Sequence, residues 1–191
     1  MKKIIATIFL GSMAFANAQV IIGDAVGTAT TKTSVLLEFA ANQNKGLILP
    51  YVRTKSLTPT EGTILLDASL PTATPGTEAR VKYYAGSVKG WVDLSGQDAN
   101  LNSTTVLANF ATEQPSSITE TATSKAIIGA QTTTADGVLV LESTTKAMVL
   151  PIVGDVQNIP SPSPGMLVYV NKTAAKRLAV YNGSKWSFWK P

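Results

Sequence analysis

Few side chains in this sequence have the chemistry for catalysis. The 191 residues include no histidine and no cysteine, which removes the Ser–His–Asp and Cys–His arrangements and the Cys/His zinc sites. Phosphate-binding motifs of the Walker A and G-x-G-x-x-G types do not occur either. We therefore expect no enzymatic activity, no cofactor and no metal site.

The twelve acidic residues are the remaining candidates for acid–base chemistry. A glycosidase needs two carboxyl groups about 5–10 Å apart, and nothing in the sequence brings two of them into one pocket. Glu38 and Glu142 do recur at matching places in the two halves of the chain, each just before a polar turn. We interpret them as exposed carboxylates at strand ends, facing Lys45 or Lys146 across the turn.

A second acidic segment resembles the start of a calcium-binding loop. Asp98, Asn100 and Asn102 place oxygen atoms at alternate positions. A calcium loop of this type also needs Gly at its sixth position and Glu at its twelfth, and those positions hold Ser103 and Asn109. We interpret the segment as a solvated loop.

Aromatic residues form the strongest candidate binding surface. They cluster near the end of each half of the chain and form a candidate interaction or ligand platform: Tyr83, Tyr84, Trp91, Tyr181, Trp186, Phe188 and Trp189. Exposed Trp and Tyr on a β-sheet would stack on sugar rings. The alternative is that they pack across strands, where aromatic pairs stabilise hairpins by about 0.2–1 kcal/mol each.

The chain contains two copies of one sequence pattern, which makes it an internal repeat. Each copy starts with Ile-Ile-Gly and continues through a Thr-rich stretch into an apolar strand. A polar turn ending in Lys follows, then an apolar strand ending in Pro, then a strand led by Gly, and last an aromatic hairpin. The copies begin at Ile21 and Ile127, and the second hairpin contains Asn182-Gly183, a dipeptide favoured in type I′ turns.

These patterns predict an all-β fold of two tandem, small, antiparallel and hairpin-rich β modules. We place module 1 at residues 19–97, a Ser/Thr-rich linker at 98–124 and module 2 at 125–191, with a weak helix signal around 104–112. Modules this small bury little apolar surface. Without disulfides, packing of one module on the other or oligomerisation is the expected source of stability.

The N-terminus has the three parts of a cleaved signal peptide. Lys2 and Lys3 precede an apolar run from Ile4 to Phe15, and Ala-Asn-Ala ends at Ala18. Residues 1–18 are therefore expected to be removed on export, leaving the protein extracellular, at the cell surface or in the periplasm. We expect no transmembrane segment in the mature chain, and the scattered Lys and Arg predict no nucleic-acid partner.

The second copy resembles a module of secreted Bacteroidota proteins and phage tail-fibre-like proteins. That module reads roughly STTKGFLPPRM, then GLxVYN, then YNGxxW. Here it is matched by 143–151, by 165–171 and by 181–186, although Ala147 replaces the usual Gly and Ile152-Val153 stands where Pro-Arg-Met is usual. The first copy matches more loosely. The resemblance implies an extracellular, repetitive, fibre- or surface-associated protein and carries no catalytic residues.

The sequence thus leads to a secreted, non-enzymatic structural or interaction protein of the cell surface, the extracellular matrix or a fibre-like assembly. Its partner would be another protein or a second copy of itself. The alternative is a carbohydrate-binding or adhesin module that holds a glycan on exposed Trp and Tyr.

Overall fold

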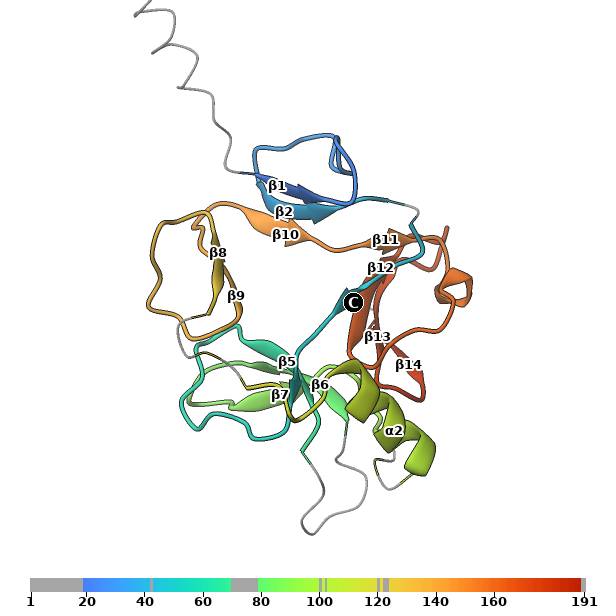
Figure 1. Ribbon diagram of the computed structural model, residues 1–191. Helices are drawn as coiled ribbons and strands as arrows, with labels where there is room; N and C mark the ends of the chain where they lie inside the picture. Colours follow the sequence, from blue (N-terminus) through green and yellow to red (C-terminus); the bar gives the residue numbers. More distant parts are fainter. Residues whose placement is uncertain are drawn as a thin grey trace, which may run out of the picture.

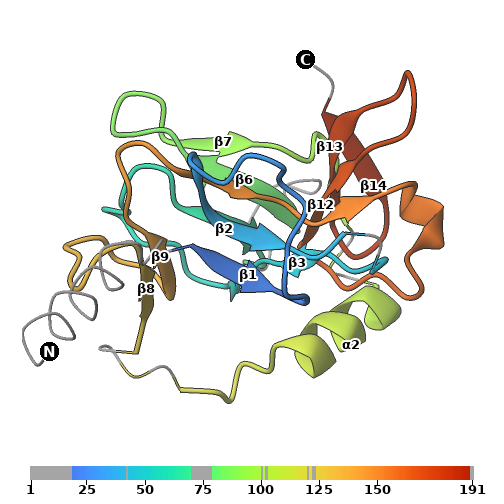
Figure 2. The same cartoon turned by 90° about the horizontal axis from the view of Figure 1, so that it is seen from above.

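The computed structural model describes residues 19–41, 43–69, 79–99, 101, 103–119, 121 and 124–189. The predicted signal peptide, residues 1–18, lies outside this set. Figures 1 and 2 show a molecule built almost entirely of β-strands, with one α-helix among the described residues. The predicted all-β fold class is therefore confirmed. No helix in the described part of the chain is long and apolar enough to cross a membrane.

In the described part of the chain, seven strands follow one another in each half. We define repeat 1 as residues 20–93 and repeat 2 as residues 126–189. Repeat 1 contains β1 (Val20–Ile22), β2 (Val35–Phe39), β3 (Leu47–Ile48), β4 (Tyr51–Val52), β5 (Ile64–Asp67), β6 (Arg80–Tyr84) and β7 (Trp91–Asp93). Repeat 2 contains β8 (Ala126–Ile128), β9 (Leu139–Leu141), β10 (Ala147–Val149), β11 (Ile152–Val153), β12 (Met166–Val170), β13 (Arg177–Tyr181) and β14 (Trp186–Trp189). The β-branched and aromatic residues of these strands suit a pleated, half-buried surface.

The two repeats pair their strands in the same way. The first two strands of each repeat run parallel and form a small sheet that we call the head, β1–β2 in repeat 1 and β8–β9 in repeat 2. The last four strands form a larger sheet that we call the body, in the order β4-β5-β6-β7 and β11-β12-β13-β14. In each body a parallel pair is followed by two antiparallel hairpins. The predicted antiparallel hairpins are thus present in each body.

The third strand of each repeat runs from its head to its body and pairs with the other repeat (Figure 1). We call β3 and β10 the crossing strands. β10 lies parallel to β2 of the first head, with Met148 opposite Leu37. β3 lies antiparallel to β12 of the second body, with Leu47 opposite Leu167. The repeats therefore share two sheets, and the module boundaries at 97 and 125 stay a prediction.

One hydrophobic core serves both repeats. It contains side chains from both bodies, from the segment after β3 and from the segment between the repeats: Leu49, Tyr51, Leu66, Val81, Leu101, Phe110, Leu167 and Val180 are all buried in it. A second, smaller cluster lies within repeat 2 around Val153 and Val168. A single repeat has too little apolar surface for a large core of its own, so sharing a core is how this chain buries enough of it.

A short helix, α2 (Thr104–Glu113), lies between the repeats, at the place of the weak helix signal. Its N-cap residue, Ser103, makes no side-chain capping bond. Phe110 is its buried residue, with its ring centroid 5.0 Å from that of Tyr51. Phe110 also packs against Gly183, where a Cβ atom would come within 2.9 Å of its ring. Tertiary packing therefore stabilises this helix, as is usual for one so short.

The turn of the last hairpin differs from its prediction. A type I′ turn would place Asn182 and Gly183 at its centre, both with positive φ. Gly183 has a φ of +100°, but Asn182 is not among the positive-φ residues and its N–H donates to the carbonyl of Lys185 at 3.2 Å. The central residues are thus Gly183 and Ser184. The buried side-chain oxygen of Asn182 accepts the N–H groups of Ser184 and Lys185 at 3.0 and 2.8 Å, and these bonds hold Asn182 at the start of the turn.

Candidate functional site

Four of the aromatic residues singled out in the sequence form two matching pairs in the body hairpins. Tyr84 on β6 lies opposite Trp91 on β7, with ring centroids 5.4 Å apart. Tyr181 on β13 lies opposite Trp186 on β14, with ring centroids 5.2 Å apart. Burial raises the pKa of the Tyr181 hydroxyl. These pairs are cross-strand contacts that stabilise the two hairpins.

The other three aromatic residues lie apart from these pairs. Tyr83 is half-buried and sits opposite Val92. Phe188 and Trp189, on β14, are 46% and 59% exposed, and the guanidinium of Arg177 lies 5.3 Å above the Phe188 ring. This is cation–π geometry. A glycan platform at these two residues stays a prediction.

Glu38 is a buried, fully bonded carboxylate in the first head. Its side chain is 0% exposed. One oxygen accepts the N–H groups of Thr28 and Ala29, both at 2.9 Å, and the other accepts from Lys32 and Gln19. Burial alone would raise the pKa of Glu38, but the Lys32 ammonium and the two N–H groups outweigh it and hold the pKa below its usual value. The carboxylate thus ties the loop before β2 to the head.

The expectation of two matching exposed glutamates is wrong. In the first head the N–H of Ala40 donates to the last carbonyl of β1 at 2.8 Å, and in the second head the N–H of Glu142 makes the same bond to β8 at 2.9 Å. Glu142 therefore corresponds to Ala40. Glu38 lies earlier, inside β2, where its side chain enters the protein instead of facing Lys45. Glu142 is half-buried and accepts from the hydroxyl of Thr133.

A second buried carboxylate, Asp67, lies at the end of β5. It is 2% exposed and sits between two ammonium groups, with Lys55 Nζ at 2.6 Å and Lys82 Nζ at 2.7 Å. The hydroxyl of Ser69 also donates to it, at 2.5 Å. Burial opposes ionisation, but the bonds from the two lysines and the serine outweigh it and lower the pKa of Asp67 to about 2. This charge cluster links β5 to β6 and has no histidine or thiol with which to do chemistry.

We expect protonation of Asp67 to lower the free energy of unfolding in acid. Because its pKa is lower in the folded chain than its usual 3.8, its contribution is present above pH 4 and is lost as the pH falls towards 2. Asp67→Asn should cost about 1–2 kcal/mol of unfolding free energy at pH 7 and much less near pH 2. Urea unfolding of both proteins at the two pH values measures the difference, and an equal loss at both would contradict the assignment.

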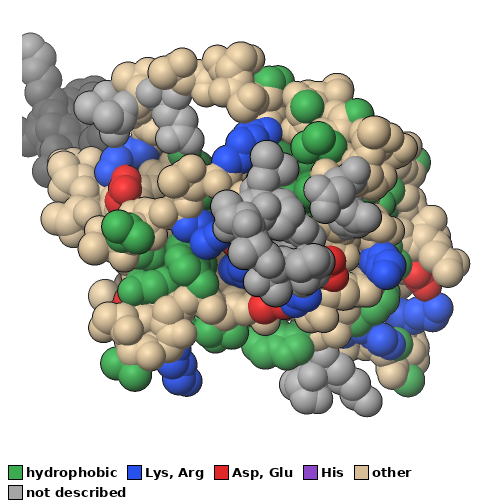
Figure 3. Space-filling view, turned by 90° about the horizontal axis from the view of Figure 1, so that it is seen from below, with side chains coloured by type: hydrophobic (Ala, Val, Ile, Leu, Met, Phe, Trp, Pro, Cys, Tyr) green, Lys and Arg blue, Asp and Glu red, His purple; other side chains and the backbone are tan. Residues whose placement is uncertain are grey.

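No group of three or more metal-ligating side chains comes together in the described part of the chain. In the segment that resembles a calcium loop, Asn100 and Asn102 lie outside the described residues, and Asp98 lies 3.8 Å from the guanidinium of Arg80. Figure 3 shows basic and acidic side chains interspersed on the face seen from below. Among the described residues on that face, side chains of the two charges are mixed.

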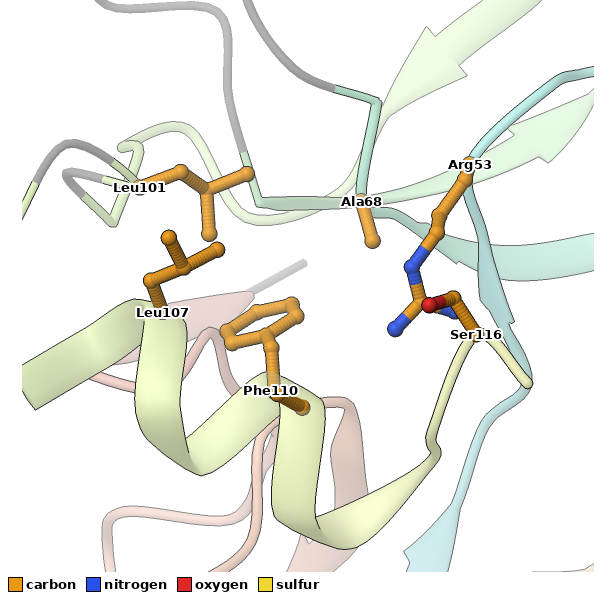
Figure 4. A pocket seen from close by; sticks show the side chains of 7 residues that line it. Arg53, Ala68, Leu101, Leu107, Phe110 and Ser116 are labelled. Carbon is orange, nitrogen blue, oxygen red and sulfur yellow. The ribbon is translucent and has the colours of Figure 1, made fainter. Parts of the chain in front are cut away.

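A pocket of about 410 Å³ lies between α2 and the end of β5 (Figure 4). It is lined by Arg53, Ala68, Leu101, Leu107, Phe110, Ala111 and Ser116. Leucine and phenylalanine side chains form one side, and the guanidinium of Arg53 lies beside Ser116 on the other. No carboxylate is among these lining residues, so the pocket offers an apolar surface with one cation and no general base.

Gln114, directly after α2, is a structural residue that the sequence did not reveal. Its side-chain amide donates to the carbonyl of Leu49 at 3.1 Å, and its side-chain oxygen accepts the N–H of Tyr51 at 2.9 Å. It bonds to this stretch of backbone as a neighbouring strand would. Its own carbonyl accepts from Arg53 at 2.7 Å. The segment predicted as a linker is thus docked on the backbone of repeat 1.

A second cavity, a groove of about 530 Å³, lies between the body of repeat 1 and the head of repeat 2. Its walls include Thr63, Ile64, Leu65 and Trp91 from the first body, and Asp136, Gly137 and Val138 from the second head. The two walls are joined by a hydrogen bond from the Asp136 N–H to the Thr60 hydroxyl oxygen at 3.1 Å. Thr121, Ser124 and Lys125, from the segment between the repeats, line the groove as well.

The comparisons with known proteins point to assembly. No curated protein and no solved structure matches the chain. Residues 127–190, 64 of the 191, match the model of a family described as a phage tail like trimerisation region. The match starts in β8 and ends directly after β14, so its extent is that of repeat 2. Repeat 2 is therefore similar to a structural region that forms trimers, and the phage tail-fibre part of the resemblance is supported.

Proposed function

We propose that this chain is an exported structural protein that self-associates into trimers and forms part of a fibre-like or cell-surface assembly. The observation that carries the proposal is the match of repeat 2 to a phage tail like trimerisation region. The match covers the head, the crossing strand and the body of that repeat. Repeat 1 has seven strands in the same order, and its head and body strands pair as those of repeat 2 do, so we extend the proposal to it.

The way the repeats contact each other supports assembly. Each crossing strand leaves its own repeat and adds to a sheet of the other. Contacts of this kind need no covalent connection between the two repeats, because they are made by backbone hydrogen bonds and apolar side chains. The same contacts can form between repeats of different chains, as in the exchange of an identical element between protomers.

Export is part of the proposal and rests on the N-terminal pattern that ends at Ala18. Cleavage there would make Gln19 the first residue of the mature chain. Gln19 is bonded through its side-chain amide to the buried Glu38, and β1 begins at the next residue. A mature chain starting at Gln19 would therefore keep every strand of the first head.

The mass of the mature protein, residues 19–191, tests the proposal. Light scattering behind size exclusion should give three times the mass of the single chain across a range of concentrations. The same sample in denaturant supplies the single-chain mass as a control. A single-chain mass at every concentration would rule out self-association.

A further inference from the structure

Strand positions of the two repeats can be aligned through their pairing, although the loops between the strands differ in length, so contacts in one repeat can be compared with those in the other. In the heads, Phe39 is paired with β1 as Leu141 is paired with β8. In the bodies, the N–H of Gly62 donates to the carbonyl of Tyr84 as that of Gly165 donates to Tyr181, at 2.9 and 2.7 Å. It follows that Leu36 and Leu37 correspond to Val138 and Leu139, and that Thr63 and Ile64 correspond to Met166 and Leu167.

The head of repeat 1 has a neighbour on its outer edge. β10 pairs with β2 there, and the N–H of Ala147 donates to the carbonyl of Ser34 at 2.8 Å. With this strand in place, Leu36 and Leu37 are 2% and 0% exposed. A head is thus buried by the crossing strand of the repeat that follows it.

The body of repeat 2 also has a neighbour. β3 pairs with its strand β12 beside Met166 and Leu167, and the N–H of Leu49 donates to the carbonyl of Gly165 at 3.1 Å. Gly165 is tightly surrounded, since a Cβ atom on it would lie 3.3 Å from both Leu66 and Tyr51. A body is thus covered by the crossing strand of the repeat that precedes it.

The first head is covered by β10 and the second body by β3. The corresponding places on the second head and on the first body are open. In the second head, β9 pairs with β8 alone among the described strands. Val138 and Leu139 are 52% and 41% exposed there, where their counterparts in the first head are buried. In the first body, a Cβ atom on Gly62 would meet nothing within 4 Å.

The two open positions face the same groove. It is the cavity of about 530 Å³ described above, with Thr63 and Ile64 on one wall and Gly137 and Val138 on the other. A strand lying in this groove would contact the second head as β10 contacts the first head. It would also contact the first body as β3 contacts the second body. Following the order seen within the chain, that strand belongs to a third repeat that closes a ring of three.

We propose that this groove holds the crossing strand of a third repeat, supplied by a second copy of this chain. The inference rests on the proposed self-association and gives its location. A trimer of chains brings six repeats, which complete two rings of three when one of the chains places its two repeats in different rings. In the first head Lys146 precedes the residue bonded to Ser34, and the counterpart of Ser34 in the groove is Asp136. An incoming lysine would lie near that carboxylate and near Lys125, which also lines the groove and donates to the carbonyl of Ala135.

The test is a charge placed in the groove of the mature protein. Val138→Lys should weaken self-association by about tenfold or more, because the side chain that the third repeat buries becomes a cation. Val88→Lys is the matched control, since Val88 is an exposed valine, at 97%, on the β6–β7 turn outside the groove. Light scattering over a dilution series gives the association of each protein, and circular dichroism gives its fold.

The outcomes separate the two proposals. If Val138→Lys loses the oligomer and Val88→Lys keeps it, the result supports the groove as the binding site for the crossing strand of a second copy. An oligomer equally stable in wild type and Val138→Lys overturns the groove and leaves self-association standing, while a wild-type monomer overturns both. If Val138→Lys does not fold, Val138→Thr, which has the same shape, decides: weaker association than wild type supports the groove, and unchanged association overturns it.

Discussion

Replacing Phe110 by Ala should reduce the unfolding free energy by about 3–5 kcal/mol, the usual cost of removing a buried Phe ring. Phe110 is 2% exposed and is the buried side chain of α2. It contacts Tyr51 of repeat 1 and packs on Gly183 of repeat 2. Its loss would open a cavity at the point where helix and both repeats meet. Urea unfolding at one fixed protein concentration measures the effect, because association with other copies also adds stability.

Leu107→Ala is the matched control for this prediction. Leu107 lies on the same helix and lines the same pocket, but it is 45% exposed. Its replacement should cost less than about 1 kcal/mol. If the two variants lost the same stability, the helix would be held by something other than the burial of Phe110. A large loss in Phe110→Ala alone would show that the segment between the repeats is part of the folded core.

Replacing Glu38 by Ala should cost about 3 kcal/mol or more, since removing one partner of a buried charge network leaves the others unpaired. The N–H groups of Thr28 and Ala29 would lose their acceptor, and the Lys32 ammonium its counter-ion. β2, which carries Glu38, is also the strand on which β10 of repeat 2 lies. We therefore expect the loss to be seen in global unfolding, measured by urea denaturation at pH 7.

Glu142→Ala is the control for Glu38→Ala. Glu142 precedes a polar turn as Glu38 does in the sequence, but it is half-buried and takes one hydroxyl donor, from Thr133. Its replacement should cost less than about 1 kcal/mol. Equal costs for the two variants would contradict the structural difference between the heads. A Glu38→Gln variant, which keeps two acceptor positions on one oxygen, should fall between Glu38→Ala and wild type.

Several features of the fold followed from local sequence. The alternation of β-branched and aromatic residues, the Gly-led strands and the hairpin turns are local signals, and the structure has the strands where these signals lie. The tandem order was also visible, because the same features recur in the same order in both halves of the chain, from Ile-Ile-Gly to the aromatic hairpin. The helix at 104–113 gave a weaker signal, since a short helix without a capping bond depends on the packing of Phe110.

The pairing between repeats could not be derived from the pattern. A crossing strand has an apolar sequence whether it pairs with its own head or with another repeat, and strand partners depend on long-range geometry. The alignment of the first head with the second could not be derived from the sequence for a similar reason. Alignment of like residues placed Glu38 with Glu142, whereas the hydrogen bonds to β1 and β8 place Ala40 there. An inserted or deleted residue in a loop changes such an alignment without leaving a mark in the strands.

The sequence by itself determined that this protein is a repetitive β protein without histidine or cysteine chemistry, because composition and short-range periodicity carry that information. Only the tertiary structure decided that Glu38 is buried, that Gln114 bonds to the backbone of repeat 1, and that Val138 faces an open groove. Burial and backbone partners are set by residues far apart along the chain. The groove between Val138 and Thr63 is of this kind, since it is recognised by comparing two assembled repeats and not from the residues of either one.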